Sequence, residues 1–254
     1  MKYLLLTLSF FMLISCQSET ETETEQQIEE IQEIELIDSH SENNIAELKN
    51  LYTVNAVKVD KTGKVFHNQG EIIEYYQKND FSNSAVEVIK SVAAGQEHHF
   101  EYEISQFENA NGQLFKQLII WDLDKKPKKR TFEFVAEANN TENDKTIIDE
   151  RRNEWIHLCN QHNAQNLLEE IYTENTIYYN HKPVIVGHED LAVEYKYMNN
   201  EQYELFLKPI IVEMVQNDLV YEIGQCSGTY GGKYILIWQK GKDNVWRVLV
   251  DSNI

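Results

Sequence analysis

The sequence is short of basic residues, prolines and glycines. Its 23 lysines and arginines stand against 42 aspartates and glutamates, which gives a formal net charge of −19 at pH 7. This imbalance argues against nucleic-acid binding, because contacts with phosphates require Lys and Arg. Three prolines and ten glycines among 254 residues are too few for a disordered chain, and a hydrophobic content of 42% is typical of a folded one.

Cysteine is also rare, since only Cys159 and Cys226 follow Cys16. Both fall in the second half of the chain. A disulfide between them would fit an oxidising compartment, whereas two buried free thiols would fit a domain with a sufficient hydrophobic core. We favour the free thiols.

The start of the chain has the pattern of a targeting segment. Lys2 supplies a positive charge, and residues 3–14 are apolar except for Thr7 and Ser9. This run is too short to span a bilayer and has the length of the hydrophobic region of a signal peptide. It ends just before Cys16 in a pattern that resembles the lipobox of bacterial lipoproteins, in which the cysteine is acylated. The alternative is a plain signal peptide with a chance cysteine.

The lipobox resemblance implies that residues 1–15 are removed and that lipid on Cys16 anchors the protein. Each buried methylene contributes about 0.8 kcal/mol, so several acyl chains hold firmly where one binds marginally. Gln17 stands where inner-membrane retention requires Asp, which favours the outer membrane of a Gram-negative bacterium, facing the periplasm or the cell surface. Residues 16–25 contain an acidic tether without large apolar residues, and such a segment cannot bury enough surface to fold.

The rest of the chain contains an internal repeat. Four segments recur in the same order: residues 51–56 as 171–176, 102–106 as 221–225, 118–121 as 235–238, and 132–135 as 246–249. The spacing between them changes only through loops, so the sequence predicts a tandem duplication of a unit of about 110 residues. Two copies do not make a solenoid, and each unit should therefore have its own core.

The second copy indicates which elements each unit contains. Apolar residues at helical spacing predict helices near residues 148–159, 163–172 and 188–198. Strands are predicted at residues 176–179, 210–215, 219–228, 233–239 and 245–251, with polar turns typical of hairpins. Helices followed by antiparallel hairpins predict an α+β fold. The polar residues 140–145 mark the linker between the copies.

The run LLEEIYTENTIYYNHKPVIVG, followed by LVYEIGQC, YILIWQK and NVWRVLVDS, resembles the NTF2-like superfamily in its SnoaL-like and DUF4440-type branch. The resemblance covers residues 146–254 and, more weakly, 26–139, where Ile28, Ile31 and Ile34 stand at the position of the first helix. It implies two tandem cone-shaped domains. Each would be a curved antiparallel sheet wrapped around about three helices, with a pocket at the wide end of the cone.

The same resemblance indicates where catalysis would be placed. The ketosteroid isomerase branch has a general-base aspartate after the short strand that follows the second helix. Asn180 stands there in the second copy and cannot accept a proton, although the adjacent His181 could act instead. Asp60 stands there in the first copy; burial in an apolar pocket would raise its pKa, but we favour an exposed hairpin turn. Neither copy has a counterpart of the family's oxyanion-donating tyrosine and protonated aspartate.

Other charged groups give little evidence for a site. Glu97, His98 and His99 are consecutive, but neighbouring strand residues face opposite ways, so the two histidines cannot easily share an ion. His181 and His188 lack a third ligand. The basic run of residues 125–130 is interpreted as a charged hairpin tip or as a contact for an acidic partner. We therefore expect no metal and no cofactor.

A set of aromatic residues provides the predicted ligand pocket. These residues lie on elements whose inner faces line the pocket in the NTF2-like family, with one amide beside them: Trp155, Tyr178, Asn180, Tyr195, Trp238 and Trp246. Apolar walls with a few polar tips suit a small-molecule site. Each aromatic residue also fits an ordinary core position.

Three functions fit these observations. The first is a membrane-anchored lipoprotein whose domains bind a small apolar ligand or, through their sheet faces, a protein partner or second copy of the chain, without catalysis. The second is an isomerase, dehydratase or cyclase, which requires Asp60 or His181 to point into a closed apolar cavity. The third is a surface-exposed interaction scaffold. We rank them in this order, because the sequence contains no complete acid–base constellation.

Overall fold

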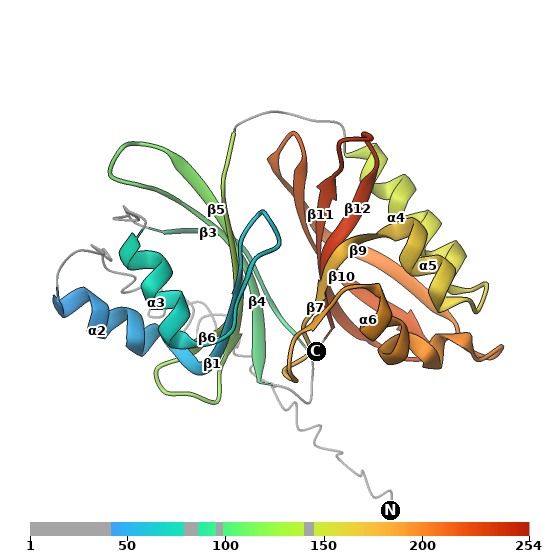
Figure 1. Ribbon diagram of the computed structural model, residues 1–254, viewed down its shortest axis with the longest axis horizontal. Coiled ribbons are helices and arrows are strands. Elements are labelled where there is room, and N and C mark those ends of the chain that lie inside the picture. Colours follow the sequence, from blue (N-terminus) through green and yellow to red (C-terminus); the bar gives the residue numbers. More distant parts are fainter. Residues whose placement is uncertain (1–41, 79–85, 95–98, 140–144, 254) are drawn as a thin grey trace, which may run out of the picture. The chain divides into compact units, whose positions relative to one another are not determined.

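The computed structural model describes residues 42–78, 86–94, 99–139 and 145–253, and Figure 1 shows two consecutive halves with helices and a sheet in each. Cys16, the tether and the predicted first helix of copy one lie outside the described residues. So do residues 140–144 of the linker. Within the described ranges, no helix is long and apolar enough to cross a membrane.

The first half contains two described helices and a six-stranded sheet. α2 (Glu42–Leu51) leads into β1 (Tyr52–Val59), and α3 (Gln69–Lys78) follows the short β2 (Val65–Phe66). The other strands are β3 (Glu87–Ala93), β4 (Phe100–Glu108), β5 (Leu114–Asp122) and β6 (Lys129–Glu137). Asn68 caps α3, because its side chain accepts a hydrogen bond from the backbone N–H of Glu71 at 3.0 Å.

The second half repeats this plan. Its helical elements are α4 (Thr146–Cys159), α5 (Ala164–Ile171), α6 (His188–Glu194) and the 3₁₀ helix η1 (Tyr195–Asn199). Its strands are β7 (Tyr172–Tyr178), β8 (Ile185–Val186), β9 (Leu205–Gln216), β10 (Leu219–Gly228), β11 (Gly232–Lys240) and β12 (Trp246–Asn253). Asn163 caps α5 by accepting a hydrogen bond from the N–H of Asn166 at 3.1 Å.

The strand order confirms the predicted fold class of two tandem α+β units. The first sheet has the order β2-β1-β6-β5-β4-β3, and the second has the matching order β8-β7-β12-β11-β10-β9. One detail differs from the expected antiparallel sheet. β1 pairs with β6, and β7 with β12, in parallel, so each sheet is mixed. Parallel neighbours need a long connection, and the helices and hairpins between these strands provide it.

The alignment of the last repeated segment is wrong in register. Ile120 lies opposite Phe132 in the first sheet, and Ile237 lies opposite Val250 in the second. Phe132 therefore corresponds to Val250 and not to Trp246. The sequence alignment was shifted by an even number of residues, which keeps every side chain on its own face of the strand. Alternation of apolar and polar residues could not detect the shift.

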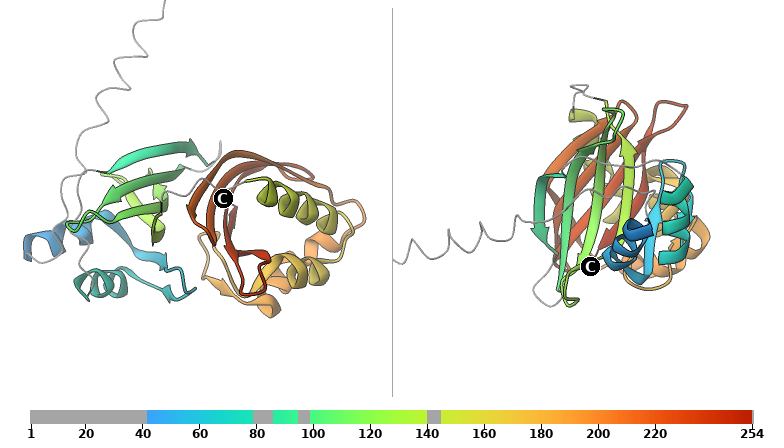
Figure 2. Two further views of the ribbon diagram at one scale, coloured as in Figure 1. Left: turned by 90° about the horizontal axis from the view of Figure 1, so that it is seen from above. Right: turned by 90° about the vertical axis from the view of Figure 1, so that its left-hand side faces the viewer.

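The two faces of the second sheet belong to two different cores. One face packs on α4, α5 and α6, and includes Val220, Leu236 and Trp238. Figure 2 (left) shows this sheet curving around the olive-green α4. The opposite face, which includes Tyr221 and Ile237, belongs to a core that also contains residues of β4, β5 and β6. The two sheets thus contact each other through the faces that point away from the helices.

Polar contacts accompany this shared core. The Lys116 ammonium donates a hydrogen bond to the backbone oxygen of Met214 at 2.9 Å, and Lys116 also forms an ion pair with Glu213. The Tyr221 hydroxyl donates to the backbone oxygen of Lys116 at 3.1 Å. These bonds satisfy polar groups that the contact between the sheets removes from water.

Candidate functional site

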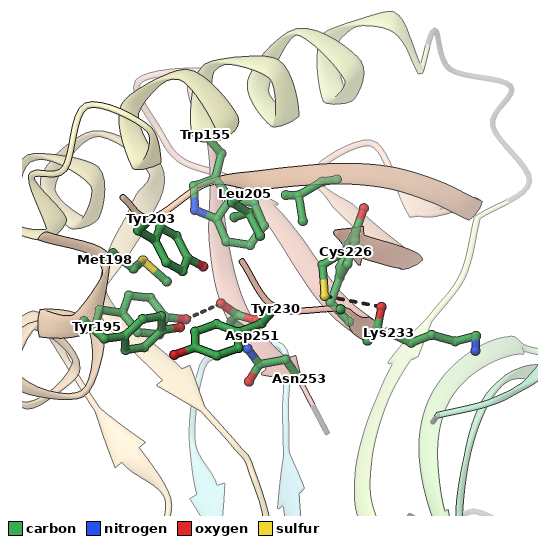
Figure 3. A pocket seen from close by; sticks show the side chains of 15 residues that line it. Trp155, Tyr195, Met198, Tyr203, Leu205, Cys226, Tyr230, Lys233, Asp251 and Asn253 are labelled. Atoms are coloured by element: carbon green, nitrogen blue, oxygen red, sulfur yellow. Dashed lines mark hydrogen bonds between the residues drawn. The ribbon is translucent and has the colours of Figure 1, made fainter. Parts of the chain in front are cut away.

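The second half contains a cavity of about 240 Å³ between its helices and one end of its sheet. Its walls come from α4, η1, the start of β9, the β10–β11 turn and the end of β12. Figure 3 shows the lining side chains, of which the main ones are Trp155, Tyr195, Tyr197, Met198, Tyr203, Leu205, Leu207, Cys226, Tyr230, Lys233, Tyr234, Asp251 and Asn253. Most of this wall is aromatic or aliphatic, which is typical of a small-molecule site.

Asp251 is the acidic group of the cavity wall. It is 2% exposed, and its Oδ2 accepts hydrogen bonds from the hydroxyls of Tyr172, at 2.8 Å, and Tyr195. Burial raises the pKa of Asp251 to about 6, although the two tyrosine hydrogen bonds lower it. The carboxyl is thus mostly ionised at neutral pH and can accept a hydrogen bond or a proton.

Trp155 supplies an unused hydrogen-bond donor. Its side chain extends from α4 into the cavity (Figure 3) and is 3% exposed. No described residue accepts a hydrogen bond from its indole N–H, which is buried. A buried donor without an acceptor costs roughly 1–3 kcal/mol. Because the nitrogen itself is buried, Trp155 contributes its aromatic ring to the cavity wall.

Three tyrosines form the rim of the cavity. The ring of Tyr197 lies edge to face with those of Tyr203 and Tyr230, with centroids 5.4 Å and 6.0 Å away. Tyr203 is buried, whereas Tyr230 is 63% exposed. Aromatic rings at an entrance provide a large apolar contact area at a low cost in side-chain entropy.

The first half has a related cluster around Glu133. The hydroxyls of Tyr52 and Tyr76 both donate hydrogen bonds to its carboxylate. Lys58 Nζ lies 2.7 Å from Oε1 of Glu133, and Arg130 Nη1 lies 2.5 Å from Oε2. Burial by itself would raise the pKa of Glu133, but the charges of Lys58 and Arg130 outweigh it and lower the pKa to about 2.

The Glu133 cluster corrects the interpretation of the basic run. Residues 125–130 were expected to form an exposed hairpin tip. Lys125 and Lys128 do pair with surface acids, but Arg130 belongs to β6 and is buried against Tyr52, Trp121 and Glu133. The sequence could not distinguish it from its neighbours, because its burial depends on packing against Tyr52, which lies in a strand far away along the chain.

The predicted pocket residues divide into three groups. Trp155 and Tyr195 line the cavity. Tyr178 and Asn180 lie behind it, since the Tyr178 hydroxyl donates to Asn253 at 2.6 Å and Asn180 donates to Tyr178 at 3.3 Å. The remaining two, Trp238 and Trp246, are buried core residues that do not line the cavity.

The two predicted catalytic candidates lie away from the cavity. Asp60 holds a turn, because its Oδ1 accepts hydrogen bonds from the N–H groups of Thr62 and Lys64 at 2.8 and 3.2 Å. His181 is exposed and stacks on Phe100, with ring centroids 3.9 Å apart. Neither side chain points into a closed apolar cavity.

The candidate metal ligands are not assembled into a site. Glu97 and His98 lie outside the described residues, while His99 contacts Asp124 at the surface. His188 interacts with the backbone oxygen of Thr173 at 2.8 Å. Within residues 42–78, 86–94, 99–139 and 145–253, no group of three His, Cys, Asp or Glu side chains is arranged to hold a metal ion. Cys159 and Cys226 are free thiols.

Comparisons with known proteins found matches among solved structures alone. No family model and no curated protein matches the sequence. Similar solved structures include an NTF-2 like protein of unknown function from Shewanella oneidensis, with 15% identity, a TM-score of 0.38 and coverage of 42% of this chain and 95% of that one. A ketosteroid isomerase-like protein from Erwinia carotovora atroseptica has 14% identity, a TM-score of 0.37 and coverage of 44% and 95%. These values are too low to carry an argument about function.

Asp251 and most of the cavity tyrosines were not predicted as site residues. Asp251 ends an apolar run in the last strand, where an acid is a detectable signal. Lys58 and Tyr178 are equivalent in the repeat. Lys58 lies opposite Glu133 and Tyr178 lies opposite Asp251, so the correct alignment pairs Asp251 with Glu133. The misaligned register concealed this correspondence.

Proposed function

We propose that the second half of the chain binds a small, largely apolar molecule with one polar group in the cavity beside Asp251. The observation that carries the proposal is a mostly aromatic cavity with the buried carboxyl of Asp251 in its wall. The volume of about 240 Å³ is below the range of roughly 300–1,000 Å³ for sites of drug-sized ligands. The ligand is therefore small.

Binding without catalysis has the stronger support. The isomerase, dehydratase or cyclase alternative required Asp60 or His181 in a closed apolar cavity, and neither residue lines it. The cavity offers a hydrogen-bond acceptor from Asp251 and a mostly apolar wall. This set orients a molecule by its polar group and holds the remainder by burial.

A binding experiment with 2-naphthol tests the proposal. Its hydroxyl can donate to Asp251 and its rings can contact the apolar wall, so saturation-transfer NMR and calorimetry should detect binding to the purified protein. Leu207→Trp fills the cavity and should abolish binding. Phe206→Trp is the matched control, because Phe206 is the next residue of β9 and lies exposed outside the cavity.

A second variant tests the role of the carboxyl in the cavity wall. Asp251→Asn keeps the shape of the side chain but removes its charge, and should weaken 2-naphthol binding by about three- to tenfold. Unchanged affinity in Leu207→Trp would show that the probe binds elsewhere and would refute the proposal. Absence of binding to the wild-type protein would do the same.

We also propose that the chain is a lipoprotein anchored to the outer membrane through Cys16, with each half an NTF2-like domain of the SnoaL-like kind. The apolar run of residues 3–14 before Cys16 supports the anchor. Metabolic labelling with an alkynyl palmitate should mark the wild-type protein and not Cys16→Ser, while Cys159→Ser serves as the control. Label retained in Cys16→Ser would contradict the proposal. Protease treatment of intact cells would separate a surface-facing scaffold from a periplasmic protein.

A further inference from the structure

The two halves contain the same three-residue arrangement, a carboxylate that receives hydrogen bonds from two tyrosine hydroxyls. We call Tyr52, Tyr76 and Glu133 the first cluster, and Tyr172, Tyr195 and Asp251 the second cluster. Tyr52 and Tyr172 are the first residues of β1 and β7, the strands that pair in parallel with the strand of the carboxylate. Tyr76 lies in α3 and Tyr195 in η1. The residues around Glu133 in the first cluster therefore show which groups can surround a carboxylate at the equivalent position of Asp251.

In the first cluster the carboxylate is paired with a buried ammonium group. Lys58 Nζ is 2.7 Å from Glu133 Oε1. The same nitrogen lies 4.8 Å and 4.9 Å from the ring centroids of Tyr75 and Tyr76. An ammonium ion between a carboxylate and two aromatic rings has both Coulomb and cation–π stabilisation. Arg130 adds a second cation to Glu133.

In the second cluster both cations are replaced by uncharged residues. Strand pairing places Tyr178 at the position of Lys58, and Val248 at the position of Arg130. Among the residues that the structure describes, Asp251 has hydrogen bonds from tyrosines and no basic partner. A buried carboxylate without a counter-ion is unfavourable. The space beside Asp251 is the cavity.

We propose that the cavity binds a small organic ammonium ion, with its charged nitrogen beside Asp251 as the nitrogen of Lys58 lies beside Glu133. This inference rests on the proposed function and names the polar group of the ligand as a cation. The aromatic wall would surround the ammonium ion and contribute cation–π attraction. The side chain of Lys233 borders the cavity but is directed away from Asp251 (Figure 3).

The overall charge of the protein also suits a cationic ligand. The formal net charge of −19 attracts cations toward the protein. The ligand class is therefore a small alkylammonium compound.

A pair of probes of equal shape tests the charge. Choline and 3,3-dimethylbutan-1-ol differ by the replacement of the quaternary nitrogen with carbon, so only the first carries a charge. Calorimetry at pH 7.5 should show choline binding about tenfold more tightly than the alcohol, because only choline is attracted by the charge of the Asp251 carboxylate. Equal affinity for the two probes, or preference for the alcohol, would overturn the inference.

Two variants locate the effect at Asp251. Asp251→Asn removes the charge and keeps the acceptor, and should abolish the preference for choline. Glu174→Gln is the control, because it removes one negative charge from the exposed side of β7 and should leave the preference unchanged. Tyr178→Lys introduces the lysine of the first cluster and should lower choline affinity about tenfold, since the new ammonium replaces the ligand's. This variant keeps the test valid if Asp251→Asn does not fold.

The results for 2-naphthol separate the two proposals. If 2-naphthol binds in the cavity and choline shows no advantage over its neutral counterpart, the cation inference fails and the proposed function stands. If neither choline nor 2-naphthol binds, or both bind unchanged to Leu207→Trp, the proposed function fails as well. A choline preference that survives in Asp251→Asn would also refute the inference.

Discussion

The rings of Phe134 and Tyr221 lie edge to face, with centroids 5.7 Å apart and an interplanar angle of 82°. Phe134 belongs to β6 of the first sheet, and Tyr221 to β10 of the second. Both are buried in the core that the two sheets share. Because this core is continuous, loss of packing in one half removes contacts from the other.

Phe134→Ala should therefore destabilise the whole described structure. Removal of a fully buried phenylalanine side chain costs about 3–5 kcal/mol, and denaturant unfolding should remain a single transition because the halves share a core. Circular dichroism and tryptophan fluorescence would measure it. Val54→Ala, at a position that is 73% exposed, should change stability little. Two separate transitions, with only one shifted, would contradict this prediction.

Glu222→Gln should break a buried ion pair. Arg152 Nε and Nη2 lie 2.5 and 2.9 Å from the two carboxylate oxygens of Glu222, and both residues are buried. Loss of the Glu222 charge leaves the buried guanidinium with the exposed carboxylate of Asp149 alone, at a cost of about 3–5 kcal/mol. The control is Asp149→Asn, which removes an exposed partner of Arg152 and should cost about 0–1 kcal/mol. Equal stability losses in the two variants would disprove the prediction.

Asp251 should make stability fall as pH rises through about 6. Burial raises the pKa of Asp251 to about 6, above its ordinary value near 4, so between these values the folded protein binds a proton that the unfolded chain has lost. The wild-type protein should therefore lose about 2 kcal/mol relative to Asp251→Asn between pH 4 and pH 7. Urea unfolding of both proteins across this range would measure the difference.

The groups that face Asp251 do not obscure this signal. They are Tyr172, Tyr178, Tyr195, Tyr197 and Cys226, and burial raises the pKa of each. None of them titrates between pH 4 and 7. The low pKa of Glu133 makes stability rise with pH in a more acidic range. This effect is the same in the wild-type protein and in Asp251→Asn, so it cancels in the difference. A stability difference that is constant with pH would contradict the prediction.

Gly224→Ala should disturb the cavity wall. A Cβ atom at Gly224 would lie 2.2 Å from the Cζ and hydroxyl oxygen of Tyr234, which donates a hydrogen bond to Glu222 at 2.7 Å. Displacement of Tyr234 should cost about 1–3 kcal/mol and weaken 2-naphthol binding. Gly231→Ala is the control, since no atom lies within 4 Å of its added Cβ. A stable Gly224→Ala protein with unchanged binding would refute this account.

Local pattern predicted most elements of the second half. The strand predicted at residues 219–228 is β10 with the same bounds, because alternation and flanking turns are encoded nearby in the chain. The helix at residues 163–172 is α5 with Asn163 as its cap. The pairing of Asp251 with Tyr178 was not predictable in this way, since an even shift along β12 preserves the same alternation.

The sequence by itself determined the acidic charge, the duplication, the order of helices and strands and the α+β class, because composition and periodicity are properties of the chain alone. Only the tertiary structure decided which aromatic residues line a cavity and which, like Trp238, are core. It also brought Asp251 together with Tyr172 and Tyr195 from three separate elements. Desolvation and long-range hydrogen bonds exist only once distant segments pack, so the chemistry of that carboxyl is a property of the fold.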